Sequence, residues 1–375
     1  MKPYLLALIL LVSTPFLQAA PVPAPPAIAA SGYLLIDMHS GRELVALDSD
    51  QRMEPASLTK IMTAHVLFEE LAHGNLKLDD MVRVSEKAWK EPGSRMFIEV
   101  NTQVSVENLM RGLIIQSGND AAVALAEYVA GSEDAFANLM NEHAARMGMD
   151  GTHFVNATGL PHPDHYTTPR DIARVTIATI RDYPEYYKMY AEKEFTFNKI
   201  RQHNRNNLLW RDETVDGVKT GHTKSAGYCL VASAEREGMR LVSVVMGADS
   251  AKARLKQSQA LLNYGFRFYE THPVYKAGQA LAQARIWKGE QETVPVGLQQ
   301  DLHITIPRRQ FDKLAARSEL KSGIQAPINK GDVLGEAILE LQGETVTRVP
   351  LVALQDMPEG GLWRLTVDTV KQWME

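Results

Sequence analysis

The chain has 375 residues, of which 45 % are hydrophobic and 23 % are charged, and its formal net charge is −5. This is the usage of a globular protein, so fibrous and disordered classes are excluded, and the length suits two domains better than one. The 40 basic residues form no long run and are outnumbered by 45 acidic ones, which gives nucleic-acid binding little support. The single cysteine, Cys229, excludes an intramolecular disulfide and is expected to be a buried core thiol.

The first twenty residues follow the order of a secretory signal peptide, with a basic residue, an apolar run and then small residues. Lys2 supplies the charge, residues 5–12 are apolar, and Ala19 and Ala20 end the segment. The apolar run is short for a membrane span, although an uncleaved membrane anchor is the alternative. We therefore predict an exported protein with a signal peptide over residues 1–20, whose cleavage site the sequence leaves open.

Residues 30–271 carry strand signals at both ends and helical patterns between them. A hairpin is expected over residues 33–47, and further strands are expected over 218–221, 228–234 and 240–247. Helices are expected from Pro55 onward and over residues 106–115, 121–129, 133–147, 169–180 and 252–264. Because strands and helices are segregated rather than alternating, the pattern predicts an α+β domain in which helices flank a largely antiparallel sheet.

The helical pattern fades near residue 272. Short β-rich runs, separated by turn residues, follow at 284–287, 303–306, 333–341 and 346–352. This spacing predicts a small all-β domain over residues 272–358.

Residues 361–375 have the pattern of an amphipathic helix. Leu362, Trp363, Val370 and Trp373 fall on one face at helical spacing, and charged residues lie elsewhere. Tryptophan on such a face suits a membrane interface, so we predict a membrane-association helix. A terminal helix packed on the protein is the alternative.

Ser57 and Lys60 lie three residues apart in a predicted helix, so their side chains share a face. A serine hydroxyl needs a base before it can attack, and lysine can be that base only when it is neutral, which burial and nearby positive charge favour. The spacing alone is weak, because Ser318 and Lys321 repeat it in the β-rich region. We interpret that second pair as an ordinary solvated helix turn.

Two other segments carry groups that suit a binding site. Ser117 and Asn119 lie between two apolar helices, where both can point into a cleft; a helix-breaking turn capped by Asn119 is the alternative. Lys219, Thr220 and Gly221 lie on a predicted strand, where the cation and the hydroxyl can bind a carboxylate and the glycine lets a ligand approach. An ordinary strand end is the alternative there.

Taken in order, these three sets form the signature of penicillin-binding proteins and class A β-lactamases. The chain resembles the low-molecular-mass penicillin-binding proteins of the D-alanyl-D-alanine carboxypeptidase type, peptidase family S11, over residues 30–375. The resemblance rests on segments 55–63 (PASLTKIMT), 117–122 (SGNDAA), 156–160 (NATGL), 166–168 (YTT), 216–223 (DGVKTGHT), 265–268 (GFRF) and 306–308 (IPR). It implies a β-lactamase/transpeptidase-like catalytic domain followed by the small all-β domain.

The resemblance also implies a role for each candidate residue. Ser57 would attack the carbonyl between two terminal D-alanines, with Lys60 as its general base, while Ser117 and Asn119 would complete the proton path and the substrate contacts. The backbone N–H groups of Ser57 and His222 would form the oxyanion hole. The substrate's C-terminal carboxylate would be bound by Lys219, Thr220 and Arg254, and Gly221 would let the substrate approach the strand. Arg205 lies at a position where the family often has an arginine near the site.

The implied reaction removes the terminal D-alanine from peptidoglycan pentapeptides, and β-lactams would acylate the same serine. No cofactor and no metal are implied, and the enzyme is expected at the periplasmic face of the inner membrane, held peripherally by the C-terminal helix. Three alternatives stay open. A class A β-lactamase would have an aspartate in place of Gly118 and lack the β-rich domain. A D,D-endopeptidase would share the fold, and a non-catalytic penicillin-binding wall scaffold would be expected to lack one of the motif residues.

Overall fold

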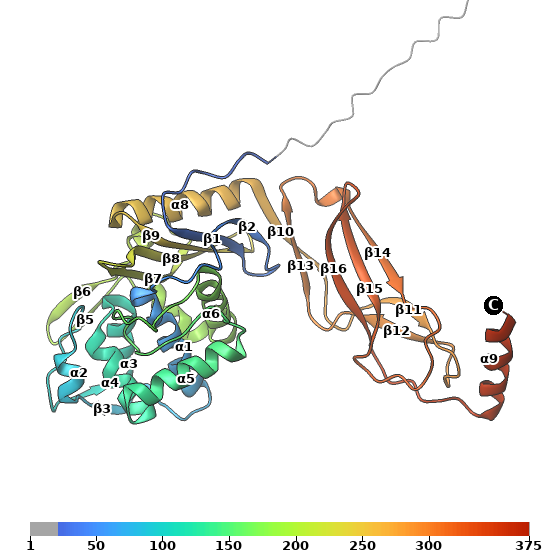
Figure 1. Cartoon of the computed structure of the whole chain (residues 1–375), viewed down its shortest axis with the longest axis horizontal. Helices are drawn as coiled ribbons and strands as arrows, with labels where there is room; N and C mark the ends of the chain where they lie inside the picture. Colours follow the sequence, from blue (N-terminus) through green and yellow to red (C-terminus); the bar gives the residue numbers. More distant parts are fainter. Residues whose placement is uncertain (1–21, 375) are drawn as a thin grey trace, which may run out of the picture.

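The computed structural model describes residues 22–374, which form two parts joined by an extended strand (Figure 1). The first part combines a five-stranded antiparallel sheet with helices, and the second is built of strands and ends in one helix. The predicted α+β fold followed by an all-β domain is therefore confirmed. The predicted signal peptide, residues 1–20, lies outside the described residues.

The central sheet has the strand order β2-β1-β9-β8-β7, so β7 lies at its edge. Its strands are β1 (Gly32–Asp37), β2 (Glu43–Leu47), β7 (Val215–Thr223), β8 (Gly227–Arg236) and β9 (Met239–Ala248). The strand expected over residues 218–221 is longer than predicted, because β7 pairs with β8 along almost its whole length. Both faces of β8 and β9 are buried, which matches their nearly continuous apolar sequence.

Helix α8 (Ala251–Phe268) packs on one side of this sheet, and the helical layer lies on the other (Figure 1). The longer helices of that layer are α1 (Thr59–Ala72), α3 (Val106–Arg111), α4 (Asn119–Ala130), α5 (Glu133–Arg146) and α6 (Pro169–Asp182). Short elements complete the first part: α2 (Glu86–Lys90), α7 (Pro184–Tyr187), β3 (Met81–Arg83), β4 (Gln103–Ser105), β5 (Glu194–Phe197) and β6 (Ile200–His203). Helix α1 is almost completely buried, so the groups it carries are held rigidly.

One predicted helix is divided. The expected helix over residues 106–115 is α-helical only to Arg111, and Gly112–Gln116 forms a π-helical turn. Ser117 then takes a left-handed conformation with φ 64° before α4 begins at Asn119. Wide turns of this kind shift the side chains that follow around the helix axis and occur often at functional sites.

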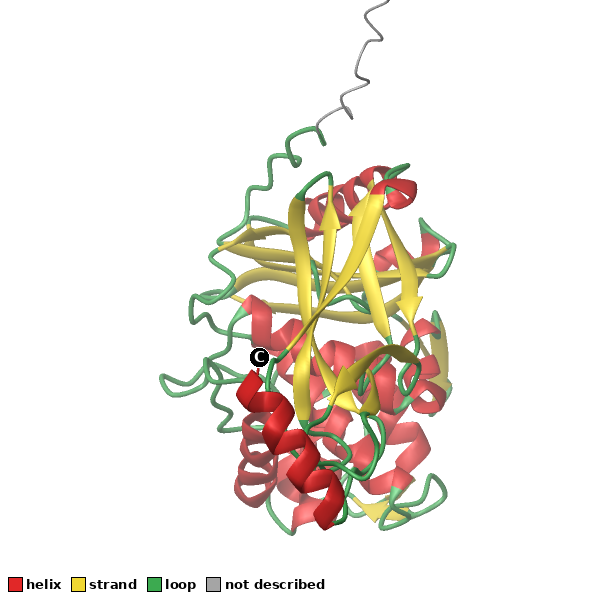
Figure 2. Cartoon of the chain, turned by 90° about the vertical axis from the view of Figure 1, so that its right-hand side faces the viewer, coloured by secondary structure: helices red, strands yellow, loops and turns green. Residues whose placement is uncertain are grey.

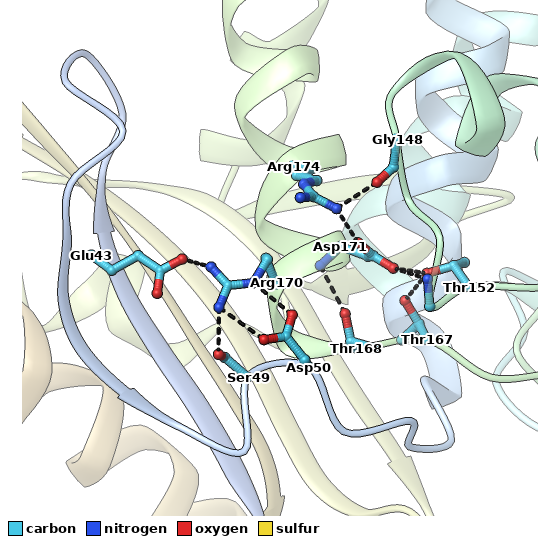
Figure 3. Close-up of polar contacts among 11 residues, drawn as sticks. Glu43, Ser49, Asp50, Gly148, Thr152, Thr167, Thr168, Arg170, Asp171 and Arg174 are labelled. Atoms are coloured by element: carbon cyan, nitrogen blue, oxygen red, sulfur yellow. Dashed lines mark hydrogen bonds and ion pairs between the residues drawn. The ribbon is translucent and has the colours of Figure 1, made fainter. Parts of the chain in front are cut away.

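The start of α6 is tied to the chain segment that leads into the first helix of the layer (Figure 3). The Thr168 hydroxyl caps α6 by accepting the Asp171 N–H at 3.1 Å, and the Asp171 carboxylate accepts the Thr152 hydroxyl at 2.8 Å. The Arg170 guanidinium donates to both carboxylate oxygens of Asp50, at 2.6 and 3.0 Å. The contacts of Arg170 hold the segment that precedes α1 against the start of α6.

The second part contains a five-stranded antiparallel sheet with the order β11-β12-β16-β15-β14 and a separate strand pair, β10 and β13. Its strands are β10 (Tyr269–Tyr275), β11 (Ala280–Arg285), β12 (Thr293–Gly297), β13 (Leu302–Pro307), β14 (Leu314–Leu320), β15 (Val333–Leu341) and β16 (Glu344–Ala353). Ser318 lies on β14, opposite Ala337 of β15, so its interpretation as part of a helix turn is wrong. Strand pairing with β15 overrides the weak helical preference of residues 318–321.

A hydroxyl-rich cluster joins the two parts. Asp37, at the end of β1, accepts the Thr271 hydroxyl of β10 at 2.8 Å and the Ser40 hydroxyl at 2.8 Å. The Thr305 hydroxyl of β13 lies 2.6 Å from the Ser40 hydroxyl and 2.8 Å from that of Thr271. Because Asp37 is fully buried and each of these groups has partners, the joint is ordered rather than a loose linker.

Helix α9 (Leu362–Met374) lies beside the second part (Figure 2), and its buried acidic residue attaches it there. Asp368 is 4 % exposed and accepts the backbone N–H of Lys288 at 2.7 Å. The apolar side chains point outward instead, with Leu362 85 %, Trp363 82 % and Trp373 93 % exposed. Within residues 22–374, the structure has no helix with the length and apolar character needed to span a bilayer.

Candidate active site

The segment that carries Ser57 is a single turn of 3-10 helix, Ala56–Leu58, which leads directly into α1. Two glycines let other segments approach it closely. A side chain at Gly159 would lie 1.8 Å from the Ala56 carbonyl oxygen, and one at Gly221 of β7 would lie 3.3 Å from the Ser57 backbone nitrogen. Ser57 is therefore held between the edge strand of the sheet and the loop around Gly159.

Lys60 lies one turn into α1 and is 1 % exposed. Its Nζ is 3.2 Å from the Ser57 Oγ, 2.6 Å from the Asn119 Oδ1 and 2.6 Å from the Thr158 carbonyl oxygen. The three contacts come from three separate stretches of the chain. They surround the amine with oxygen atoms and leave no described carboxylate hydrogen-bonded to it.

Burial lowers the pKa of Lys60 to about 7, and the positive charge of Arg205 adds to the effect. A buried ammonium loses hydration that a protein interior does not replace, so the neutral amine is favoured. A neutral amine has two N–H donors and one lone pair. The Asn119 and Thr158 oxygens can take the two donors, which leaves the lone pair for the Ser57 hydroxyl.

The Asn119 amide is held at both ends. Its Oδ1 accepts from Lys60, and its Nδ2 donates to the Pro92 carbonyl at 2.6 Å. The alternative interpretation, in which Asn119 only caps a helix, is wrong, because the residue is the first of α4 and its side chain makes no capping bond. Ser117 is 3 % exposed at the end of the π-helical turn. The structure thus brings the second motif beside the first.

Strand β7 supplies the third motif. Lys219 is 2 % exposed, and burial, followed by the charges of Lys60, Arg205 and Arg254, lowers its pKa well below the usual range. Its Nζ donates to the Thr220 carbonyl at 3.1 Å. Thr220 is itself 6 % exposed. Positive charges gathered in this way around a buried amine favour the binding of a carboxylate.

The remaining predicted residues border this group. The Arg254 Nη1 donates to the backbone carbonyls of Gly221, at 2.8 Å, and of Cys229, at 3.2 Å, so it supports β7 from the α8 side. The His222 ring is exposed and stacks on Tyr228 with 4.0 Å between centroids. Arg205 is exposed but near enough to lower the pKa values of both buried lysines. Cys229 is fully buried, as expected of a core thiol.

Sequence reasoning assigned no role to several groups that hold the site together. The Thr158 carbonyl binds Lys60, and a backbone oxygen has no sequence signal. His165 Nδ1 accepts the Val155 N–H at 3.0 Å, so its proton is on Nε2, which lies 2.8 Å from the Thr59 hydroxyl. That hydroxyl donates to the Ala56 carbonyl at 2.9 Å. The chain of bonds fixes the turn that carries the predicted nucleophile.

Asp120 is a second such group. It is 1 % exposed, and its carboxylate accepts the backbone N–H groups of Met96, at 3.0 Å, and of Phe97, at 3.0 Å. The residue thereby holds the loop before β4 against the start of α4. The sequence offered one signal, since Asp120 directly follows the second motif.

Comparison with known proteins agrees with this geometry. The family model for D-alanyl-D-alanine carboxypeptidase (peptidase S11) matches residues 19–250, and the model for the C-terminal domain of penicillin-binding protein 5 matches residues 269–359. The chain belongs to the D-alanyl-D-alanine carboxypeptidase family. As a member of peptidase family S11, it is a serine-type carboxypeptidase, and both the predicted activity and the predicted family are confirmed.

Relatives within the family cover nearly the whole chain. The D-alanyl-D-alanine carboxypeptidase DacA of Escherichia coli is 43 % identical over 93 % of this chain and 89 % of its own length. Penicillin-binding protein 5 of Haemophilus influenzae superposes with a TM-score of 0.87 at 44 % identity, covering 90 % of this chain and 99 % of that one. Penicillin-binding protein D2 of Listeria monocytogenes, solved in a cefotaxime-bound form, matches 65 % of this chain and 100 % of its own at 29 % identity, with a TM-score of 0.60.

Proposed function

We propose that this carboxypeptidase removes the terminal D-alanine of peptidoglycan pentapeptides, with Ser57 as nucleophile and Lys60 as general base. The observation that carries the proposal is the placement of the Lys60 amine. It lies 3.2 Å from the Ser57 oxygen, its two other contacts accept hydrogen bonds, and its pKa is lowered to about 7. A base with a pKa near the working pH is suited to accept and return a proton.

The reaction then has two steps. The Ser57 oxygen forms a bond to the carbonyl carbon between the two terminal D-alanines, and its proton passes to Lys60. When the C–N bond breaks, the proton is delivered to the leaving nitrogen and free D-alanine departs. Water next attacks the Ser57 ester, and the shortened peptide leaves. The buried hydroxyl of Ser117 lies in the neighbouring motif and is proposed to relay the proton.

Strand β7 is proposed to bind the substrate. As the edge strand of the sheet, it can pair with an extended peptide through backbone hydrogen bonds. The backbone N–H groups of Ser57 and His222 would hold the oxyanion, an arrangement in which one donor typically contributes ~100- to 1,000-fold in rate. The close approach that Gly221 allows between β7 and Ser57 supports this pairing of donors.

The C-terminal carboxylate of the substrate is proposed to bind Lys219 and the hydroxyl of Thr220. Lys219 lies among positive charges that lower its pKa, so an incoming carboxylate relieves repulsion as well as forming a bond. The Arg254 Nη1 donates to carbonyls of β7 and β8 and so positions Gly221, while the rest of its guanidinium is proposed to help bind the carboxylate. The exposed guanidinium of Arg205 adds positive electrostatic potential around Lys219.

Covalent labelling tests the nucleophile directly. Penicillin is expected to add its mass to the one peptide that contains Ser57, because a β-lactam presents a strained amide to the same atoms. The cefotaxime-bound Listeria relative supports the expectation that β-lactams enter this site. Ser318, with its own lysine three residues later, is an internal control: label on Ser318, or none on Ser57, would refute the assignment.

We further propose that the enzyme is attached to the periplasmic face of the inner membrane through α9. The outward-facing Leu362, Trp363 and Trp373 form an exposed apolar side, while Asp368 and Arg364 face the protein. Aromatic rings at a bilayer interface are stabilised by their apolar bodies and polar edges. The arrangement supports a helix lying in the surface of the membrane.

Deleting residues 362–375 is expected to move the protein from the membrane fraction to the soluble fraction. Trp363→Gln combined with Trp373→Gln should have the same effect in sedimentation with vesicles of phosphatidylethanolamine and phosphatidylglycerol. This double variant keeps Asp368 and its bond to the β-domain, so it separates membrane contact from loss of packing. Unchanged co-sedimentation of both variants would show that α9 is only structural.

A further inference from the structure

A cluster of metal-binding side chains lies in the helical layer, away from the catalytic residues. His65 and Glu69 are four residues apart on α1 and so share a face, and His143 of α5 meets them. One ligand atom from each residue lies within 4.8 Å of those of the other two. His65 is 4 % and His143 5 % exposed, so the cluster is largely closed to solvent.

The proton position on His65 can be derived from its neighbours. The Thr179 hydroxyl of α6 donates to the Val175 carbonyl at 2.6 Å, so its oxygen is left to accept from the His65 Nδ1 at 3.1 Å. The His65 proton is therefore on Nδ1, and Nε2 carries the lone pair. A hydrogen bond from the second ring nitrogen of this kind is what fixes the tautomer of a metal-bound histidine.

The other two ligands are also oriented. Glu69 accepts from Arg146 through Oε1 at 3.1 Å and from the Tyr183 hydroxyl through Oε2 at 3.2 Å. The His143 Nδ1 lies 3.5 Å from the Glu69 Oε2. The Arg146 side chain is 60 % exposed, so its ion pair with Glu69 lies at the solvent edge of the cluster. Burial lowers the pKa values of both imidazoles, to about 4 for His65, which keeps them neutral.

We propose that His65, Glu69 and His143 bind a divalent transition-metal ion of the zinc class. Two imidazole nitrogens and one carboxylate oxygen are ligands that zinc prefers, at about 2.0–2.2 Å each, with water in the fourth position. Tetrahedral ligands at that distance lie roughly 3.4 Å apart, so small side-chain rotations close the site around the ion. Sequence reading expected no metal because His143 lies on a helix distant along the chain from the other two ligands.

The ion would act as a structural clamp. It would join α1, which carries Lys60, to α5, with α6 supplying the supporting hydroxyl of Thr179. An ion that binds the folded state and not the unfolded state raises the free energy of unfolding. Above the dissociation constant, this increase grows with the logarithm of the ion concentration. The reaction proposed above needs no contribution from this site, so the two proposals fail or succeed separately.

Zinc titration of the EDTA-treated enzyme tests the site. Isothermal calorimetry is expected to show one Zn²⁺ per chain, and the melting temperature should rise with added Zn²⁺. His143→Ala and Glu69→Gln should each weaken zinc binding by at least ~10-fold, the lower end of the loss expected even for groups that only support a ligand. Glu69→Gln keeps the size of the side chain and an oxygen for Tyr183, so it guards against a simple folding failure.

Three controls make the result decisive. His73→Ala, at the exposed end of the same helix, should leave zinc binding unchanged. Acylation of the active site with penicillin should also leave zinc binding unchanged. This control distinguishes the proposed site from zinc binding to His222 beside the active site. Co²⁺ should give the intense visible absorption of a tetrahedral site. Equal zinc binding by the wild type, His143→Ala and Glu69→Gln, or no saturable binding by the wild type, would overturn the proposal.

Discussion

Replacing Ser57 with alanine is expected to abolish release of D-alanine from a pentapeptide substrate, by ~10⁴-fold or more. Removing the nucleophile of a serine hydrolase leaves only the oxyanion hole and binding to act on the substrate. The protein should stay folded, because Lys60 keeps its contacts to Asn119 and the Thr158 carbonyl. The measurement is free D-alanine by enzyme-coupled assay, with circular dichroism as the check on folding.

Ser318→Ala is the matched control for this variant. It removes an exposed hydroxyl from the sequence pattern that resembles the nucleophile motif but lies on β14, so full activity is expected. Retained turnover in Ser57→Ala would rule out the proposed nucleophile. The same assay identifies the product, and release of a cross-bridged peptide without D-alanine would instead indicate an endopeptidase.

Replacing Lys60 with methionine is expected to slow acylation by ~100- to 10,000-fold. Methionine keeps much of the volume of the buried chain but has no amine, and general-base catalysis typically contributes a factor of that size. Loss of the buried amine also removes a donor from Asn119 and Thr158, so melting temperature should be measured beside the rate of penicillin labelling. Lys224→Met, at an exposed position after β7, should label at the wild-type rate.

The pH dependence of the wild type follows from the same amine. Lys60 accepts a proton only when neutral, and its pKa is lowered to about 7. The value of kcat/KM should therefore be level above pH 8 and fall roughly tenfold for each pH unit below 7. An acylation rate that stays constant from pH 5 to pH 8 would exclude Lys60 as the base.

The grouping of the site residues was predictable from the sequence because its charged and hydroxyl groups come in short motifs. Ser57 and Lys60 share a helix face by spacing alone, and the structure places the motifs of Asn119 and Lys219 beside them. The layers of the fold were also predictable, since the apolar runs of β8 and β9 and the helical periodicity of α6 are strong local signals.

The remaining features depend on tertiary contacts that no local pattern encodes. The Thr158 carbonyl, which holds Lys60, is a backbone group and has no sequence signature. Arg254 was expected to bind substrate, and nothing in the sequence indicated that its Nη1 would also donate to carbonyls of β7 and β8. The helix-turn interpretation of Ser318 was wrong for a similar reason, because a serine–lysine spacing can adopt a strand when a neighbouring strand is available to pair with it.

The ordered joint around Asp37 has a mechanical consequence. Since β10 follows α8 without a loop and the Thr271 hydroxyl of β10 donates to the buried Asp37 carboxylate, the catalytic part and the β-rich part are joined at two places rather than by a flexible linker. If α9 rests on a bilayer as proposed, the second part acts as a spacer that sets the distance between the active site and the membrane surface. Under the proposed attachment, the length of the β-rich part would determine which peptide stems of the wall the active site can reach, according to their distance from the membrane.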